Sequence, residues 1–128
     1  MSLDNEQVVR RIVDEAYNGG SMDAIDELVA PDFVHHDPAT GDHEGVQAVK
    51  ERITTYRTML PDLRVTVEDM ISSGDRVVTR WSSRGTHPET GQTVTSSGIM
   101  IDRIEGDRIA ETWSQWDNAG LAAQLAPG

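Results

Sequence analysis

Asp117 has the side chain whose type and setting best suit acid–base chemistry in this sequence. It ends a predicted strand over residues 108–117, and strict alternation places it on the same face as Trp113. A carboxyl group beside indole rings is partly desolvated, which raises its pKa and lets it carry a proton near neutral pH. The same aspartate also precedes a predicted final helical turn over residues 118–125, which it could cap. The sequence leaves both roles open.

Three histidines could assist such a carboxylate. His35 and His36 follow an aromatic-apolar pair in an extended stretch, and His87 ends a predicted strand. Alternation puts His87 on the face of Trp81, where it could donate a hydrogen bond to a substrate oxygen. A histidine that only satisfies local backbone at a strand end is the alternative for each. A zinc site needs three or four converging ligands, and this His-His-Asp run has no helical i, i+4 pair, so we expect no metal site.

The remaining candidates could line a pocket for a ligand. Trp81, Met100 and Trp113 lie near the open end of the predicted sheet, although a place in the ordinary core is the alternative for each. Arg103 could orient an acidic partner or extend into solvent. We predict one cavity of about 300–1,000 Å³. Its expected lining is Trp81, His87, Met100, Trp113 and Asp117.

The composition excludes several classes of function. Twenty-two acidic residues against eleven basic ones give a formal net charge of −11, a field that repels nucleic-acid phosphates. The chain has no cysteine, which rules out disulfides, thiolate metal sites and cysteine nucleophiles. No apolar run approaches the ~20 residues of a membrane span. The acidic N-terminal residues lack a signal-peptide pattern, so we expect a cytoplasmic protein.

The hydrophobic periodicity changes from helical to alternating near residue 62, and helices followed by an antiparallel meander are typical of one α+β domain. We predict helices over residues 5–17, 21–30 and 45–60 and strands over 62–71, 76–87, 93–104 and 108–117. The stretch after Pro38 is predicted as a polar loop that contains glycine. A twisted sheet wrapped around the helices leaves a cavity at its open end.

Several segments together resemble the SnoaL-like polyketide cyclase family, also called SnoaL-like ester cyclases. They are Tyr17-Asn18-Gly19-Gly20-Ser21-Met22-Asp23-Ala24, Phe33-Val34-His35-His36-Asp37-Pro38, Leu60-Pro61-Asp62-Leu63, Gly74-Asp75-Arg76-Val77-Val78-Thr79-Arg80-Trp81, Gly85-Thr86-His87, Ile101-Asp102-Arg103-Ile104 and Ile109-Ala110-Glu111-Thr112-Trp113 with Asp117, Gly120-Leu121 and Gln124-Leu125. The resemblance covers about residues 8–125 and makes the whole chain, 1–128, one SnoaL-like domain.

This resemblance implies the cone-shaped fold of nuclear transport factor 2, with N-terminal helices on a curved, mostly antiparallel sheet around an internal pocket. It also implies a homodimer and cofactor-independent chemistry, in which an aspartate that maps onto Asp117 drives an intramolecular aldol ring closure. The family's histidines map onto His36 and His87. Two departures stand out: the loop after His87 is short, and residues 93–108 contain no histidine.

The sequence therefore predicts an enzyme that acts on a small hydrophobic carbonyl compound. Asp117 would abstract a proton, His87 or His36 would polarise the carbonyl oxygen, and Trp81, Met100, Trp113 and Arg103 would contact the substrate. A non-catalytic binder of a hydrophobic small molecule and an isomerase of the same fold remain alternatives. The exposed face of the long strands, with Thr95, Ser97, Ile99 and Ile101, is expected to cover itself with a second copy.

Overall fold

The computed structural model describes residues 4–126, in which helical segments pack against a six-stranded sheet. The elements in chain order are α1 (Asn5–Arg11), the π-helical η1 (Ile12–Tyr17), α2 (Met22–Leu28), β1 (Val29–Asp37), β2 (Gly41–Glu44), α3 (Gly45–Met59), β3 (Arg64–Ser73), β4 (Arg76–Thr86), β5 (Thr93–Glu105), β6 (Arg108–Trp116) and α4 (Asn118–Leu125). Within this part of the chain, no helix combines the length and the apolar character that crossing a bilayer requires.

Local side-chain contacts explain where the N-terminal helices begin and end. The Asp4 carboxylate accepts a hydrogen bond from the Glu6 amide, and the Gln7 side chain accepts one from the Asp4 amide, so the predicted capping box is confirmed. The second segment, η1, closes with the i→i−5 bond from the Asn18 amide to the Val13 carbonyl, 2.9 Å. Ser21 then caps α2 through the Ala24 amide.

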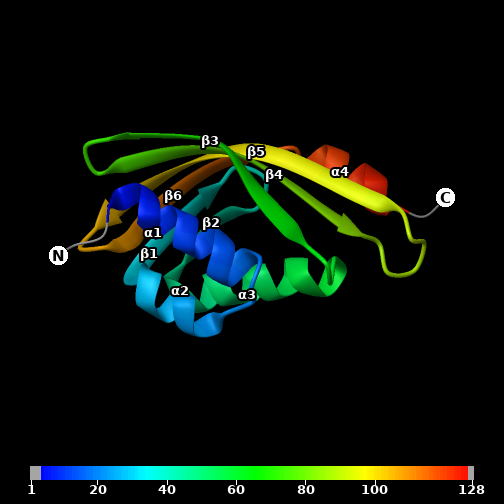
Figure 1. Ribbon diagram of the computed structural model, residues 1–128, viewed down its shortest axis with the longest axis horizontal. Helices are drawn as coiled ribbons and strands as arrows, with labels where there is room; N and C mark the ends of the chain where they lie inside the picture. The colour runs from blue at the N-terminus through cyan, green and yellow to red at the C-terminus, as the bar shows by residue number, and fades with distance from the viewer. Residues whose placement is uncertain (1–3, 127–128) are drawn as a thin grey trace.

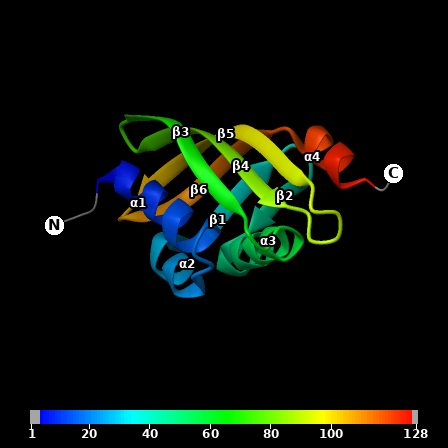
Figure 2. The ribbon, with the colours of Figure 1, turned by 45° about the vertical axis from the view of Figure 1, so that its right-hand side comes forward.

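The sheet has the strand order β2-β1-β6-β5-β4-β3 and is antiparallel except between β1 and β6, which run parallel. Figure 1 shows α1, α2 and α3 gathered on one side of the curved strands, and Figure 2 shows the same layering from another angle. We call the face toward these helices the inner face and the opposite one the outer face. The mixed, mostly antiparallel sheet agrees with the predicted fold class.

Besides β1, which was expected as an extended stretch and not as a strand of the sheet, two features of the sheet differ from the expectation. Residues 41–44, predicted as loop, form β2, which pairs with the end of β1; all four are exposed, so they show no alternation of apolar and polar residues. The second feature is a register shift between β5 and β6, where Arg103 pairs with Glu111 but Ile104 pairs with Ile109. Ala110 is thus the extra residue of a β-bulge. The bulge shifts by one position the residues of β6 that point to the inner face.

The core lies between the helices and the inner face of the sheet. Its larger part consists of Val8, Val9, Ile12, Ala16, Ala24, Ile25, Leu28, Val29, Phe33, Ile53, Val77, Ile104 and Ile109. A smaller cluster of Leu60, Leu63, Val94 and Leu121 closes the end under α4. Between these two clusters the side chains do not fill the space, and a cavity remains.

Candidate functional site

The cavity has a volume of about 460 Å³ and lies between the inner face of the sheet, η1 and α3. Most of its lining is apolar, and the buried side chains of Val9, Ile12, Val29, Phe33 and Ile109 form its deep wall. Thr40, His43, Glu51 and Thr55 are exposed and line its rim. The volume lies within the usual range for small-ligand sites, about 300–1,000 Å³, as predicted.

Polar groups enter this apolar cavity from strands β1, β5 and β6. Beyond the bulge at Ala110, alternate residues of β6 point inward, and these are Thr112, Ser114 and Trp116. His35 lies in register with Thr112 across the parallel pair. The strand ladder therefore sets His35 and Ser114 side by side on the same face.

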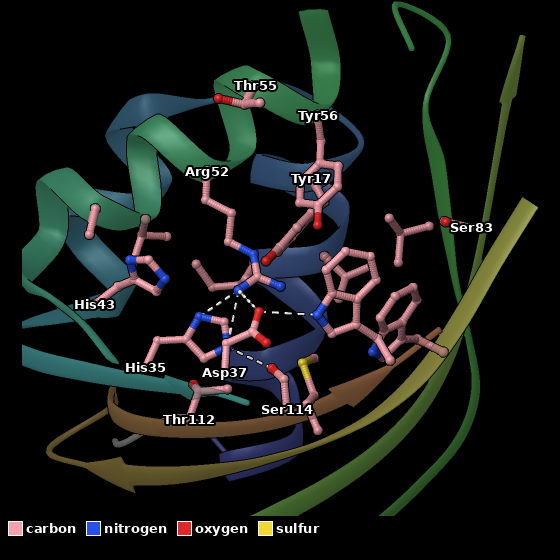
Figure 3. A pocket seen from close by; sticks show the side chains of 18 of the residues that line it. Tyr17, His35, Asp37, His43, Arg52, Thr55, Tyr56, Ser83, Thr112 and Ser114 are labelled. Atoms are coloured by element: carbon pink, nitrogen blue, oxygen red, sulfur yellow. Dashed lines mark hydrogen bonds and ion pairs between the residues drawn. The ribbon is translucent and has the colours of Figure 1, made fainter. Parts of the chain in front are cut away.

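His35 joins Ser114 to a guanidinium from α3 (Figure 3). Its Nε2 lies 2.6 Å from the Ser114 Oγ, and Arg52 Nη1 contacts the ring, most closely at Nδ1. Because an arginine can only donate, Nδ1 must accept, so Nε2 carries the proton and donates to Ser114. Burial, followed by the Arg52 charge, lowers the pKa of His35 to about 3. The imidazole is therefore neutral near pH 7.

The carboxylate of Asp37 is the anionic member of this cluster. It is 3% exposed and accepts hydrogen bonds from the Ala39 amide at 2.8 Å and from Trp116 Nε1 at 3.1 Å. Arg52 Nη1 lies 3.9 Å away. Burial alone would raise the pKa of Asp37, but the two hydrogen bonds and the arginine charge together hold it below its ordinary value. Asp37 is thus ionised and fully engaged, which makes it a fixed charge rather than a proton carrier.

Asp102 is a second buried carboxyl group in the lining. It is 2% exposed, and Thr112 Oγ1 donates to its Oδ1 at 2.5 Å. Burial raises the pKa of Asp102 to about 6, against the opposing effect of the Thr112 hydroxyl. Of the two buried carboxyl groups in the cavity lining, Asp102 has a pKa displaced toward neutrality, whereas that of Asp37 is displaced away from it.

Three predicted substrate contacts lie on the outer face and form a separate cluster there. The His36 ring stacks on Trp113 at 5.5 Å between centroids, and its Nε2 lies 2.7 Å from the Glu111 carboxylate. Arg103 Nε also donates to Glu111, at 3.2 Å. The hydrogen bonds to Glu111 and then Asp42 raise the pKa of His36.

The prediction that Trp81 and Trp113 share a face is wrong, and so is the predicted lining by Trp113. Trp81 and Met100 line the cavity as expected. The strand alternation from Ile109 to Asp117 assumed an unbroken β6, whereas the bulge at Ala110 reverses which residues point inward. Ile109 therefore points inward while Trp113 points outward.

Asp117 and His87, the two predicted catalytic residues, are not among the residues that line the cavity. Asp117 is exposed at the N-terminus of α4, where its Oδ1 accepts the Gly120 amide at 2.8 Å, so the capping role is confirmed. His87 lies in the turn after β4 and accepts the Glu89 amide on Nδ1 at 3.2 Å. Both side chains satisfy local backbone instead of facing a ligand.

Sequence reasoning missed Arg52, Asp102 and Ser114, although the first two left a signal. Arg52 lies three residues after Val49 and four before Tyr56, which places it on the inward stripe of α3. Asp102 has the same strand parity as Met100, which was assigned to the pocket. Within the described residues, no three His, Asp or Glu side chains converge in a way that could hold a metal ion.

The family model for SnoaL-like polyketide cyclases matches residues 7–125. The chain belongs to the SnoaL-like polyketide cyclase family. A search of curated proteins found no match. Among solved structures, IdmH, a proposed polyketide cyclase from Streptomyces antibioticus, is 29% identical with a TM-score of 0.86, over 96% of this chain and 99% of IdmH. A proposed polyketide cyclase from Acidithiobacillus ferrooxidans is 28% identical with a TM-score of 0.85, over 98% and 97% of the two chains.

More distant structures extend the fold beyond the SnoaL-like cyclases. A Catenulispora acidiphila protein with a ketosteroid isomerase-like fold is 19% identical, with a TM-score of 0.79 over 92% of this chain and 91% of its own. At that identity the likeness concerns the fold alone. Helices packed on a mixed, mostly antiparallel six-stranded sheet are thus the ketosteroid isomerase-like fold that this chain shares with that structure.

Proposed function

We propose that this SnoaL-like protein catalyses cofactor-independent acid–base chemistry, of the intramolecular aldol type, on a small, largely apolar carbonyl compound bound in the cavity. A cavity of about 460 Å³ with mostly apolar walls suits such a compound, and the low polarity of these walls strengthens the polar interactions made inside the cavity. The similarity to proposed polyketide cyclases over nearly the whole chain supports the reaction class.

The observation that carries the proposal is the Arg52–His35–Ser114 chain. Because His35 donates to the Ser114 Oγ, the hydroxyl hydrogen of Ser114 is left for another acceptor, and no acceptor for it occurs among the described residues. A carbonyl oxygen in the cavity would take that hydrogen bond. The positive charge of Arg52, passed on through a neutral imidazole, would strengthen it as negative charge develops on the oxygen.

The test is turnover of methyl esters, including β-keto esters, that carry a further carbonyl group far enough along the molecule for an aldol ring to close. Aldol ring closure leaves the mass unchanged, so the product is followed by chromatography and by the loss of one carbonyl ¹³C signal. Ser114→Ala should slow turnover by about 10²-fold, as for loss of one oxyanion donor. Ser82→Ala is the matched control. Ser82 lies on β4 between the lining residues Trp81 and Ser83, so its side chain points to the outer face, where its hydroxyl donates to Glu68. Equal rates in the two variants would contradict the role of the hydroxyl.

A non-catalytic binder is the second candidate, and one observation favours it. The resemblance gave the acid–base role to Asp117, but this side chain is exposed and caps α4. An apolar cavity whose fixed charges are already paired can hold a hydrophobic molecule without converting it. Native mass spectrometry of the isolated protein separates the two candidates when combined with turnover: a binder retains one unchanged ligand per chain and gives no product.

A further inference from the structure

Asp102 holds a carboxyl oxygen that nothing in the described protein satisfies. The side chain is 2% exposed and belongs to the cavity lining. Its Oδ1 is fixed by the Thr112 hydroxyl at 2.5 Å, whereas Oδ2 is buried and has no hydrogen-bond partner among residues 4–126. A buried polar atom without a partner is costly to keep, so a group that persists in this state suggests a function.

The surroundings of Asp102 suit proton transfer. Val77 on β4 and Thr112 on β6 flank it in register, and most of the cavity lining around it is apolar. Burial raises its pKa to about 6 while the Thr112 hydrogen bond opposes the rise. Near neutral pH both protonation states are then populated, which is the condition for an efficient general acid–base.

Ser114 lies within reach of the same ligand. Asp102 is the partner of Thr112 across the β5–β6 ladder, and Ser114 is two residues further on the same face, so Asp102 and Ser114 are diagonal neighbours. Diagonal neighbours in an antiparallel pair are about 7–8 Å apart. A ligand in this gap could place its carbonyl oxygen against Ser114 and a hydrogen of the adjacent carbon against Asp102.

We propose that Asp102 and Ser114 form the acid–base pair of the cavity, with Asp102 Oδ2 as the proton carrier and the Ser114 hydroxyl as the donor to the carbonyl oxygen. The inference rests on the function proposed above and names its reacting groups. The Asp102 carboxylate takes a proton from the carbon next to the carbonyl, so that C–H bond breaks and its electron pair forms the carbon–carbon double bond of an enolate. The negative charge moves to the carbonyl oxygen, which the Ser114 hydroxyl stabilises.

The cycle closes without any other reactant. The enolate carbon attacks a second carbonyl carbon of the same molecule, and the new alkoxide takes the proton back from Asp102 Oδ2–H. Atoms and charge balance, and the carboxylate is regenerated. The substrate class that follows is a ketone or β-keto ester with an unhindered α-CH₂ group, a second carbonyl group far enough along the same molecule for a ring to close, and an apolar body that fills the deep end of the cavity.

Proton abstraction can be tested before the natural substrate is known. The probes are 2-tetralone and ethyl benzoylacetate, whose α-hydrogens exchange with D₂O and are followed by ¹H NMR. The unmutated protein should accelerate exchange, and Asp102→Asn should lower the protein-dependent rate by about 10²–10⁴-fold. Asn keeps the shape and the Thr112 hydrogen bond but cannot take a proton. Asp69→Asn is the matched control, an exposed carboxylate on β3 paired with Arg80, and should leave the rate unchanged.

The outcomes separate the two proposals. No exchange by the unmutated protein with either probe overturns the proposed function and with it the role of Asp102. Exchange that survives in Asp102→Asn overturns the role of Asp102 alone, and exchange that is lost in Asp117→Asn but not in Asp102→Asn would return the role to Asp117. If Asp102→Asn does not fold, the ¹³C signal of the Asp102 carboxyl decides in the unmutated protein: it must move when 2-tetralone saturates the cavity, and a fixed signal overturns the assignment.

Discussion

His35 and His36 are neighbours in the chain, yet the sheet gives them opposite chemistry. His35 points into the cavity, is 6% exposed, and has a pKa lowered to about 3 because burial and Arg52 disfavour its charge. His36 points to the outer face, where hydrogen bonds to Glu111 and Asp42 raise its pKa. One step along a strand therefore changes a neutral hydrogen-bond relay into a group that favours the cationic form.

Carboxyl groups on the two faces differ in the reverse sense. On the inner face burial raises the pKa of Asp102, and on the outer face the hydrogen bond from His36, with help from Arg103, lowers the pKa of Glu111. The inner face thus selects uncharged forms except where several donors hold a charge, as at Asp37. On the outer face His36, Glu111, Arg103 and Asp42 form a cluster of paired charges that is open to water. On the inner face, Asp102 is the group that can change protonation state near neutral pH while it faces a ligand in the cavity.

The largest expected difference between the faces is in stability. Asp37→Ala leaves Arg52, Trp116 Nε1 and the Ala39 amide without their buried acceptor, and breaking a buried charge pair in this way costs about 3–5 kcal/mol. Urea unfolding followed by circular dichroism measures the change. The control, Asp42→Ala, removes the exposed outer-face partner of His36 and should give no measurable change. Equal losses would mean that the inner cluster is solvated and that the contrast between the faces is wrong.

The second prediction concerns the ionisation of Asp102. Because the folded-state pKa of Asp102 is about 6 and its ordinary value is 3.8, the folded protein binds this proton more tightly than the unfolded chain does. The free energy of unfolding should therefore fall, through this group, as the pH rises from about 4 to 7, by on the order of 2–3 kcal/mol. Relative to the unmutated protein, Asp102→Asn should gain stability across that interval. A difference between the two that does not vary with pH would contradict the raised pKa.

The third prediction compares the two histidines by titration. His35, with a folded pKa of about 3 against 6.5 in the unfolded chain, contributes stability that is present above pH 6.5 and is lost as the pH falls, by on the order of 1–2 kcal/mol at pH 5. His36 has a raised pKa, so its contribution is present below pH 6.5 and is lost as the pH rises. NMR of the ring signals, assigned with His35→Gln and His36→Gln, should show no titration of His35 above pH 5. A midpoint near 6.5 for both would remove the distinction.

Much of the fold was predictable because its signals are local. The Asp4–Gln7 capping box, the period of α3 and the glycines of the hairpin turns each depend on residues within a few positions, and the structure has all of them. Gly74 and Gly106 adopt φ of 59° and 58°, the left-handed conformation that tight hairpin turns require.

The site was less predictable because it depends on register. The bulge at Ala110 has no signature in the sequence, and one inserted residue moves Trp113 to the outer face while it brings Ser114 inward. The strands β5 and β6 of the site were predicted, but β1 was expected only as an extended stretch, and the wrong face of β6 was taken as the inner one. The Arg52–Asp37 pair joins α3 to β1 and depends on tertiary packing. The alternation of side chains along a strand can predict such a site only if the residues of both faces of each strand are considered as possible cavity lining.

The last prediction bears on the outer face, where we expect the smallest effect on the cavity. Ile71, Val78, Ile101 and Trp113 lie in register across four strands and form an apolar row, and Ile99 beside them is 48% exposed. We propose that a second copy of this chain covers the row, as the family resemblance implies, because so much apolar surface on a sheet face is unfavourable in water. Ile99→Asp should shift light-scattering mass from dimer to monomer. Thr58→Asp adds the same charge to the exposed side of α3 and should leave the dimer intact.

Because Ile99 points away from His35 and Ser114, both variants should bind 2-tetralone within about twofold of the unmutated affinity, a change below about 0.4 kcal/mol. A monomer in the unmutated protein would refute the dimer, and a large loss of affinity in Ile99→Asp would show that the two faces are coupled rather than independent.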